Sequence, residues 1–202
     1  MHHLRLTYPL AVLAFIAMMF APSAVRADNY TSFVQKMGDT ALTNLTGKEL
    51  AAKEREKRVR DLLNRNFDVD TIGKFAMGRH WRTATGAEQK EFLSLFENMI
   101  VKTYTQRFGE YSGQQFKVGN SKKAHANSND YIVTSQVIQK DGPPVNVEWR
   151  VRSIGGQLKV IDVIIENVSM GVTQRSDFDA VIQRGGGKVS ALIDSLKKHQ
   201  VN

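Results

Sequence analysis

Apolar positions along this chain follow two different spacings, one before and one after Gly113. Before it, they recur every three to four residues, as on amphipathic helices. Thr85-Gly86-Ala87-Glu88 has the form of a capping box, which marks a helix start. Asp68 can cap a shorter helix that Gly78 ends. We therefore expect four helices in this part, at residues 28–45, 48–66, 68–76 and 86–108.

After Gly113 the spacing changes to that of strands. Strict alternation over Val145–Arg152 predicts a strand with one buried and one wet face. Leu158–Ile165 is apolar on both faces apart from Lys159 and Asp162, so we expect a central strand covered on both sides. The other expected strands are 115–122 and 131–139, and two final helices are expected at 171–183 and 188–198.

This order of elements predicts an α+β fold with a curved antiparallel sheet of about four strands. We expect one domain over residues 28–202. Its helical parts, 28–112 and 171–202, would pack on the sheet of residues 114–166 and enclose an apolar cavity. No internal repeat is present.

The N-terminus has the pattern of a secretory signal peptide. A short basic segment precedes the apolar run Leu10–Phe20, and Val25-Arg26-Ala27 supplies small residues at the −3 and −1 positions. The run is shorter than the ~20 residues that a membrane span needs. We expect residues 1–27 to be removed by cleavage before Asp28. The chain has no Cys, which suits an exported protein of the bacterial periplasm that folds without disulfides.

The formal net charge is +8 and the isoelectric point is near 9.7. Export argues against a nucleic-acid partner, so we expect none. Two interpretations stay open: a plain solvated basic surface, or attraction to anionic membrane surfaces.

Motifs of common catalytic and cofactor sites are missing from the sequence. G-x-S-x-G, H-E-x-x-H and G-x-G-x-x-G do not occur. Gly185-Gly186-Gly187-Lys188 fails as a phosphate loop, because Val189 stands where a hydroxyl would bind magnesium. The histidines beyond residue 27 lie far apart, at His80, His125 and His199. We expect no metal site and no cofactor.

Asp162 is the polar exception within an apolar strand. A buried acid needs a partner or takes a raised pKa. One hypothesis is a structural acid that accepts from a backbone N–H or from Arg150, Arg152 or Arg175. The alternative is a general base of an enzyme that acts on an apolar substrate.

Several short motifs in the right order resemble the MlaC family of periplasmic phospholipid-binding proteins, also called the toluene-tolerance family. The motifs are Phe67-Asp68 with Ile72, Gly78-x-x-Trp81-Arg82, Gln89 with Phe92, Tyr104, Pro144-Val145-x-Val147-x-Trp149-Arg150-Val151, Leu158-Lys159-Val160-Ile161-Asp162-Val163, Val168-Ser169 and Arg175. The chain departs from the family at Leu158, usually Trp, and at Asn167, usually Gly. The run Val172–Phe178 is more similar to the hopanoid-associated HpnM branch.

The resemblance implies a sheet like that of nuclear transport factor 2, with an apolar pocket for lipid tails. It implies a monomeric periplasmic carrier, not an enzyme, that moves phospholipid or a hopanoid-type lipid between the inner and outer membranes. Implied partners are an inner-membrane ABC transporter with MCE domains, or an RND-type transporter, and an outer-membrane lipoprotein complex.

We expect the lipid tails to contact apolar side chains from the sheet and the helices. These are Phe75, Trp81, Phe96, Met99, Ile100, Tyr104, Val133, Val147, Trp149, Val151, Val160, Met170 and Phe178. Two other hypotheses remain: an enzyme with Asp162 as base, and an adaptor with a filled core and no pocket.

Overall fold

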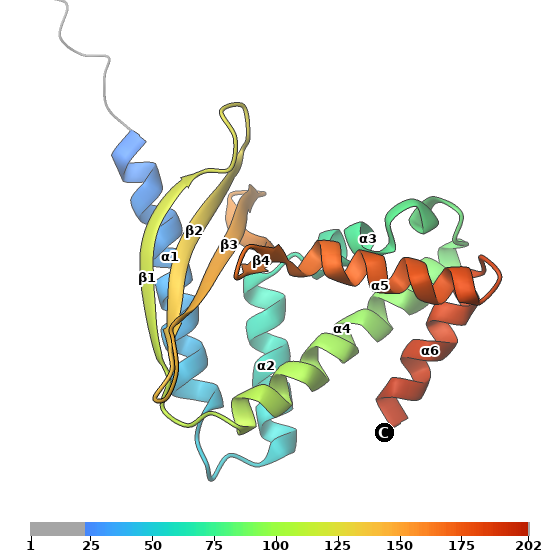
Figure 1. The fold of residues 1–202 in the computed structure, drawn as a ribbon, viewed down its shortest axis with the longest axis horizontal. Helices are drawn as coiled ribbons and strands as arrows, with labels where there is room; N and C mark the ends of the chain where they lie inside the picture. The colour runs from blue at the N-terminus through green and yellow to red at the C-terminus, as the bar shows by residue number, and fades with distance from the viewer. Residues whose placement is uncertain (1–22, 202) are drawn as a thin grey trace, which may run out of the picture.

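The computed structural model describes residues 23–201 and contains an antiparallel sheet with helices on one side and at one end (Figure 1). Residues 1–22, which make up most of the predicted signal peptide, lie outside the described residues. The helices are α1 (Ser23–Leu45), α2 (Ala52–Asn66), α3 (Val69–Met77), the 3-10 helix η1 (Gly78–Arg82), α4 (Gly86–Gly109), α5 (Met170–Arg184) and α6 (Val189–Val201). In the described part, no helix combines the length and the apolar character needed to cross a bilayer.

Two predicted helix starts are confirmed by their capping bonds. The Asp68 carboxylate accepts from the Thr71 backbone N–H at 3.0 Å and caps α3. Thr85 and Glu88 form a reciprocal capping box at the start of α4. The second helix begins later than predicted, at Ala52, because a turn occupies the residues after Gly47.

The sheet has five strands in the order β1-β2-β3-β4-β5, with all neighbours antiparallel. Their bounds are β1 (Gln115–Lys123), β2 (Asp130–Ile138), β3 (Val145–Ile154), β4 (Gln157–Ile165) and β5 (Val168–Ser169). The predicted α+β class with an antiparallel sheet and covering helices is confirmed, with one strand more than the four expected. β5 escaped prediction because two residues carry no period.

β4 differs from its prediction as a central strand covered on both sides. β3 pairs along its length, but on the other edge β4 meets only the two residues of β5 and a single bridge from Phe67 to Val160. Most of its side chains are half-buried, and only Val160 is fully buried. Its apolar outer positions therefore lie near the open edge of the sheet.

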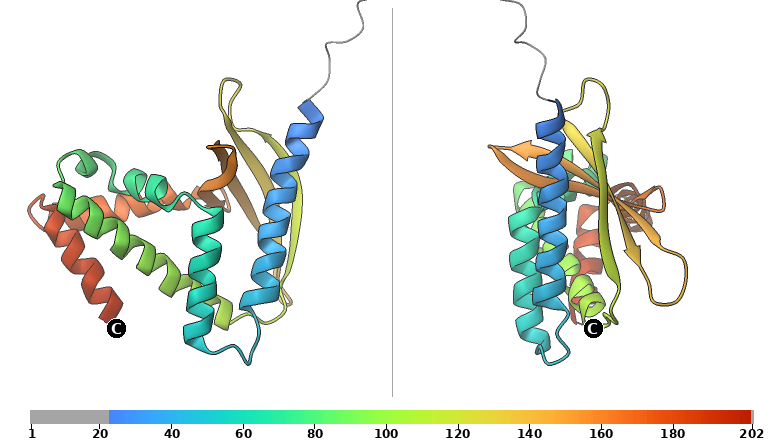
Figure 2. Two further views of the ribbon diagram at one scale, coloured as in Figure 1. Left: turned by 180° about the vertical axis from the view of Figure 1, so that it is seen from behind. Right: turned by 90° about the vertical axis from the view of Figure 1, so that its left-hand side faces the viewer.

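A β-bulge in β4 decides which of its side chains share a face. Arg150 pairs with Asp162, whereas the next residue, Val151, pairs with Val160, so Ile161 is the extra residue. Val160 and Val163 consequently point to one face of the sheet despite their odd spacing. This is the face that α1 covers (Figure 2).

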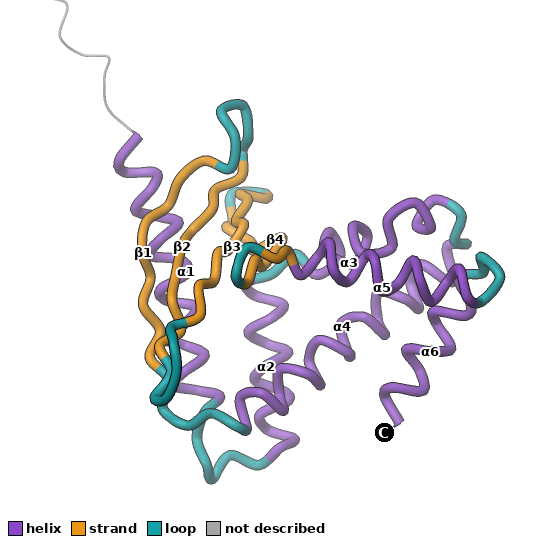
Figure 3. Tube along the Cα trace, in the orientation of Figure 1, coloured by secondary structure: helices purple, strands orange, loops and turns teal. Residues whose placement is uncertain are grey.

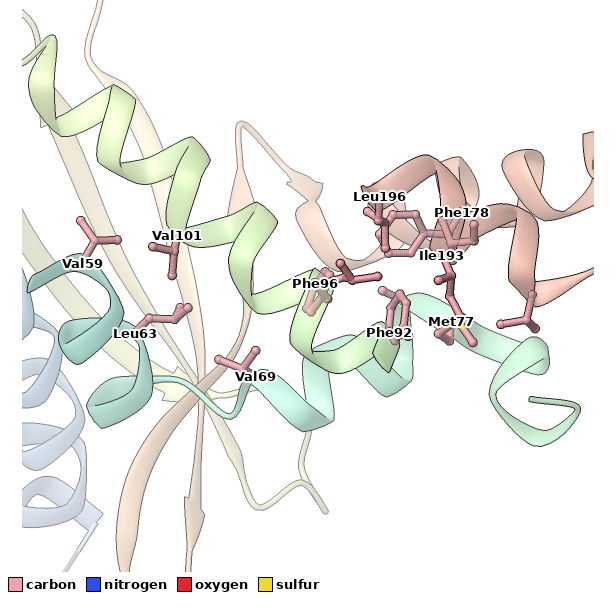
Figure 4. Close-up of a cluster of buried hydrophobic side chains, with 14 of the residues drawn as sticks. Val59, Leu63, Val69, Met77, Phe92, Phe96, Val101, Phe178, Ile193 and Leu196 are labelled. Atoms are coloured by element: carbon pink, nitrogen blue, oxygen red, sulfur yellow. The ribbon is translucent and has the colours of Figure 1, made fainter. Parts of the chain in front are cut away.

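Buried apolar side chains form two cores. The sheet core joins α1 to the covered face of the sheet and centres on Tyr30, Val34, Met37, Val133, Val151 and Val160. The helical core joins helices α2 to α6 with the C-terminal end of α1, through Ala41 and Leu45, and includes the side chains of Figure 4. In Figure 3 the sheet and α1 lie together, and α3 to α6 extend away from the sheet.

Candidate functional site

Nine of the thirteen residues predicted to contact lipid belong to the two cores, whereas Phe75, Tyr104, Val147 and Met170 belong to neither. Six of the thirteen are buried, five are half-buried, and Phe75 and Tyr104 are exposed. The buried six are Phe96, Val133, Val147, Val151, Val160 and Phe178. These six side chains have almost no accessible surface, so they are packed against other protein atoms, and they line neither of the two surface pockets described below.

The sheet core brings together four of the predicted residues. Val133, Val151 and Val160 are its buried centre, and Trp149 packs against it. The Trp149 indole N–H donates to Ser135 Oγ at 2.8 Å, so the polar end of this half-buried ring is satisfied. The apolar part of the Trp149 ring packs against the sheet core.

The helical core brings together another five. Phe96 and Phe178 meet edge to face, with ring centroids 6.1 Å apart. Trp81, Met99 and Ile100 are half-buried side chains packed against this core. α4 and η1 therefore present apolar surface that their own core covers only in part.

Two residues that prediction missed join the cores. Leu62 of α2 and Phe67, which follows it, each pack against both cores. We call this junction the seam and define it by Leu62 and Phe67. Partly buried apolar side chains are found in both of the cores that meet there, among them Met99 and Ile100 of α4 and Trp149 and Val163 of the sheet. A sequence signal for Phe67 existed, since it opens one of the family motifs, but nothing local indicated its bridge to β4.

Asp162 accepts hydrogen bonds that fix the start of α5 to β4. Its Oδ1 accepts from the backbone N–H of Gly171 at 3.0 Å and of Val163 at 2.9 Å. Its Oδ2 accepts from Ser169 Oγ at 2.6 Å, and that hydroxyl oxygen caps α5 through the Val172 N–H. With both carboxylate oxygens occupied, the geometry fits the structural acid better than the general base. None of the three arginines considered as partners bonds to it.

Two of those arginines bind a carboxylate that prediction did not single out. Asp130, only 2% exposed at the start of β2, accepts from Arg152 Nε at 2.6 Å and from Arg150 Nε at 2.8 Å. These hydrogen bonds, led by that of Arg152, hold the pKa of Asp130 below its ordinary value despite an opposing effect of burial. The cluster ties β2 to β3 on the face away from α1.

Two shallow surface pockets, of about 360 Å³ each, lie elsewhere. One is on the polar face of the sheet, beside Lys117, Thr134 and Glu148, and the other is beside the first half of α1. Neither includes any of the thirteen predicted residues. Within the described part of the chain, no three His, Asp or Glu side chains gather as a metal site would require.

Comparison with known proteins places these features in a family. A family model described as MlaC protein matches residues 35–198. The toluene tolerance protein ttg2D of Pseudomonas putida is 29% identical over 161 residues, which cover 75% of this chain and 74% of that protein. A phospholipid-binding protein from Ralstonia solanacearum, solved in complex with a phospholipid, has a similar fold. The TM-score is 0.73 at 24% identity, over 85% of this chain and 96% of that chain. The family match spans most of both cores and the seam between them, and the chain belongs to the MlaC family.

Proposed function

We propose that this protein is a periplasmic lipid carrier and that the lipid tails enter along the seam. The observation that carries the proposal is the division of the apolar interior into two cores joined by Leu62 and Phe67. A single close-packed core has no room for a ligand. Two cores that are each flanked by half-buried apolar side chains can part where they meet and take up tails between them.

The energetics of lipid transfer explain why no catalysis is needed. A two-tailed lipid has ~30 methylenes, and exposure of each to water costs ~0.8 kcal/mol, so crossing an aqueous space unaided is opposed by more than ~20 kcal/mol. A protein that surrounds the tails with apolar side chains cancels most of this cost. Transfer from membrane to protein is then nearly neutral, and therefore reversible.

Phospholipid is the cargo that the relatives favour, since the similar solved protein holds a phospholipid. A hopanoid-type lipid is the second candidate, on the HpnM-like run Val172–Phe178. We propose transfer between the inner and outer membranes, with an MCE-type ABC transporter or an RND-type transporter and an outer-membrane lipoprotein complex as partners. Residues 1–27 would direct export as a signal peptide.

The competing enzyme hypothesis lacks support from the geometry of Asp162. A general base needs a lone pair directed at a substrate proton. Both oxygens of Asp162 instead accept bonds from the chain itself, at Val163, Ser169 and Gly171.

Lipid in the native protein tests the proposal directly. Mass spectrometry of protein purified without detergent should detect co-purified lipid and identify it as phospholipid or hopanoid. Delipidated protein is then mixed with phospholipid that carries bromine on its tails, a contact quencher of tryptophan. The Trp81→Phe variant isolates the emission of Trp149, which packs on the sheet core.

We expect brominated tails to quench Trp149, and the same phospholipid without bromine to leave its emission unquenched. The Trp149→Phe variant leaves Trp81, which packs against the helical core, so the two variants report separately on contact of the tails with each core. Absence of lipid by mass spectrometry, together with no quenching in either variant, would refute lipid carriage and favour the adaptor with a filled core.

A further inference from the structure

Three apolar side chains are exposed together where α3 and α5 lie side by side. Phe75 of α3 is 43% exposed, and Val168 of β5 and Val172 in the first turn of α5 are each 53% exposed. The Phe75 ring lies against the backbone of Gly171, where an added Cβ would be only 3.2 Å away. Val172 follows Gly171 directly and Val168 precedes it by three residues, so the three exposed side chains come from adjacent backbone, and we call Phe75, Val168 and Val172 the apolar tip.

Two cations belong to this part of the molecule, since Arg175 contacts a residue of the tip and Lys74 precedes Phe75 in the chain. The Arg175 guanidinium stands over the Phe75 ring, 5.7 Å from its centroid, and Lys74 Nζ stands over the Trp81 ring at 5.6 Å. In the part of the chain that the structure describes, neither cation has a carboxylate within salt-bridge distance, and both residues are exposed. The nearby Asp179 is already engaged by His80 and Arg79. The tip therefore combines uncovered apolar surface with unneutralised positive charge.

We propose that the apolar tip is a docking site for the surface of an anionic lipid bilayer. Short apolar side chains enter the headgroup region, and adjacent Lys and Arg attract anionic lipids at about 1 kcal/mol each. A stable protein partner would need an interface of at least ~1,200 Å², far more than three side chains provide. The charge and the small area fit a reversible membrane contact.

This proposal does not depend on lipid carriage. A carrier must stop at a membrane before it exchanges lipid, but docking is measured without any transfer. Val172 and Arg175 belong to neither core and are not seam residues, so their variants change no residue of the seam. Each proposal can therefore fail while the other stands.

The test is flotation of the full mature protein with two kinds of vesicles, phosphatidylcholine alone and phosphatidylcholine with phosphatidylglycerol. We expect binding only to the anionic vesicles, with loss of binding at high salt. Val172→Asp should weaken it by roughly tenfold or more, since it removes an inserted apolar group and adds a repelled charge. Arg175→Gln should weaken it by roughly fivefold.

Ile154→Asp is the matched control. Ile154 is also an exposed apolar residue, at 38%, but it lies beside the β3–β4 turn, at the other end of β4 from β5. The Ile154→Asp variant adds the same charge as Val172→Asp and should bind the anionic vesicles as well as the unchanged protein does. Equal losses in the Ile154→Asp and Val172→Asp variants, or no preference of the unchanged protein for anionic vesicles, would overturn the proposal. Far-UV circular dichroism verifies folding, and the co-purified lipid of Val172→Asp should match that of the unchanged protein.

Discussion

Replacing Asp162 separates its structural role from a catalytic one. In Asp162→Ala, the N–H groups of Val163 and Gly171 and the hydroxyl of Ser169 lose their acceptor. Hydrogen bonds to a charged group contribute ~1.5–3 kcal/mol each when buried, whereas a helix cap contributes ~0.5–2 kcal/mol. Because these bonds are only half-buried, water can hydrogen-bond to the groups that lose their acceptor and offset part of this cost. We expect the free energy of unfolding to fall by about 2–3 kcal/mol.

The Asp162→Asn variant sharpens the expectation. Both backbone N–H groups donate to the same oxygen, Oδ1, and an amide oxygen in that position can accept both. The Ser169 hydroxyl can rotate to accept from the amide nitrogen. The main loss is the attraction between the negative charge and the N-terminus of α5, about 0.5–1 kcal/mol.

Urea unfolding followed by circular dichroism measures both variants, and an unchanged dependence on urea concentration shows that only stability changed. The loss in Asp162→Ala corresponds to a melting temperature lower by roughly 5–10 °C for a domain of this size. Asp177→Ala is the control, since it removes an exposed charge from the same helix without breaking a described bond.

Two results would refute this reasoning. If the free energy of unfolding of Asp162→Ala lay within about 0.5 kcal/mol of that of the unchanged protein, the three bonds would not hold α5 in place. If Asp162→Asn kept its stability and lipid content but lost all function in cells, Asp162 would have a chemical role that the geometry does not explain.

Two further predictions concern the packing of the sheet. Hydrogen bonds, led by that of Arg152, lower the pKa of Asp130 below 3.8 in the folded state. The ionised carboxylate therefore stabilises the fold fully above the unfolded pKa. This contribution is lost as the pH falls through the folded pKa. The urea midpoint should therefore drop steeply below about pH 4 in the unchanged protein and less in Asp130→Asn, and equal slopes would contradict this. Gly38→Ala should destabilise by roughly 1–3 kcal/mol, because its Cβ would lie 2.3 Å from the Phe116 ring that packs on α1. Gly86→Ala, where no atom lies within 4 Å, is the control, and equal thermal shifts in the two variants would contradict the close contact.

Prediction succeeded where a pattern repeats within one element. The alternation over Val145–Arg152 correctly separated the face that packs toward α1 from the face that carries Arg150 and Arg152. Such patterns suffice because side chains on a strand alternate and those on a helix recur every 3.6 residues. The caps of α3 and α4 were predictable for a related reason, since donor and acceptor are three residues apart.

Prediction failed where the information lay in another strand. The bulge at Ile161 depends on how β4 meets β3, and it reverses which β4 residues share a face. β5 is too short to show a period. Glu166 and Asn167, both with positive φ, form the two-residue turn that leads into it. Asn tolerates a positive φ better than most residues, which fits Asn167 at the second position of this turn.

The sequence by itself determined the class of fold, the order of the six α-helices, the caps of α3 and α4, the inward side of β3 and the resemblance to the MlaC family. Each of these depends on residues close together in the chain or on motifs in a fixed order. Only the tertiary structure decided that the apolar residues form two cores, that Leu62 and Phe67 join them, and that Asp162 caps α5 and does not meet an arginine. The physical reason is that these contacts depend on register and on the packing of distant segments, which local spacing does not encode.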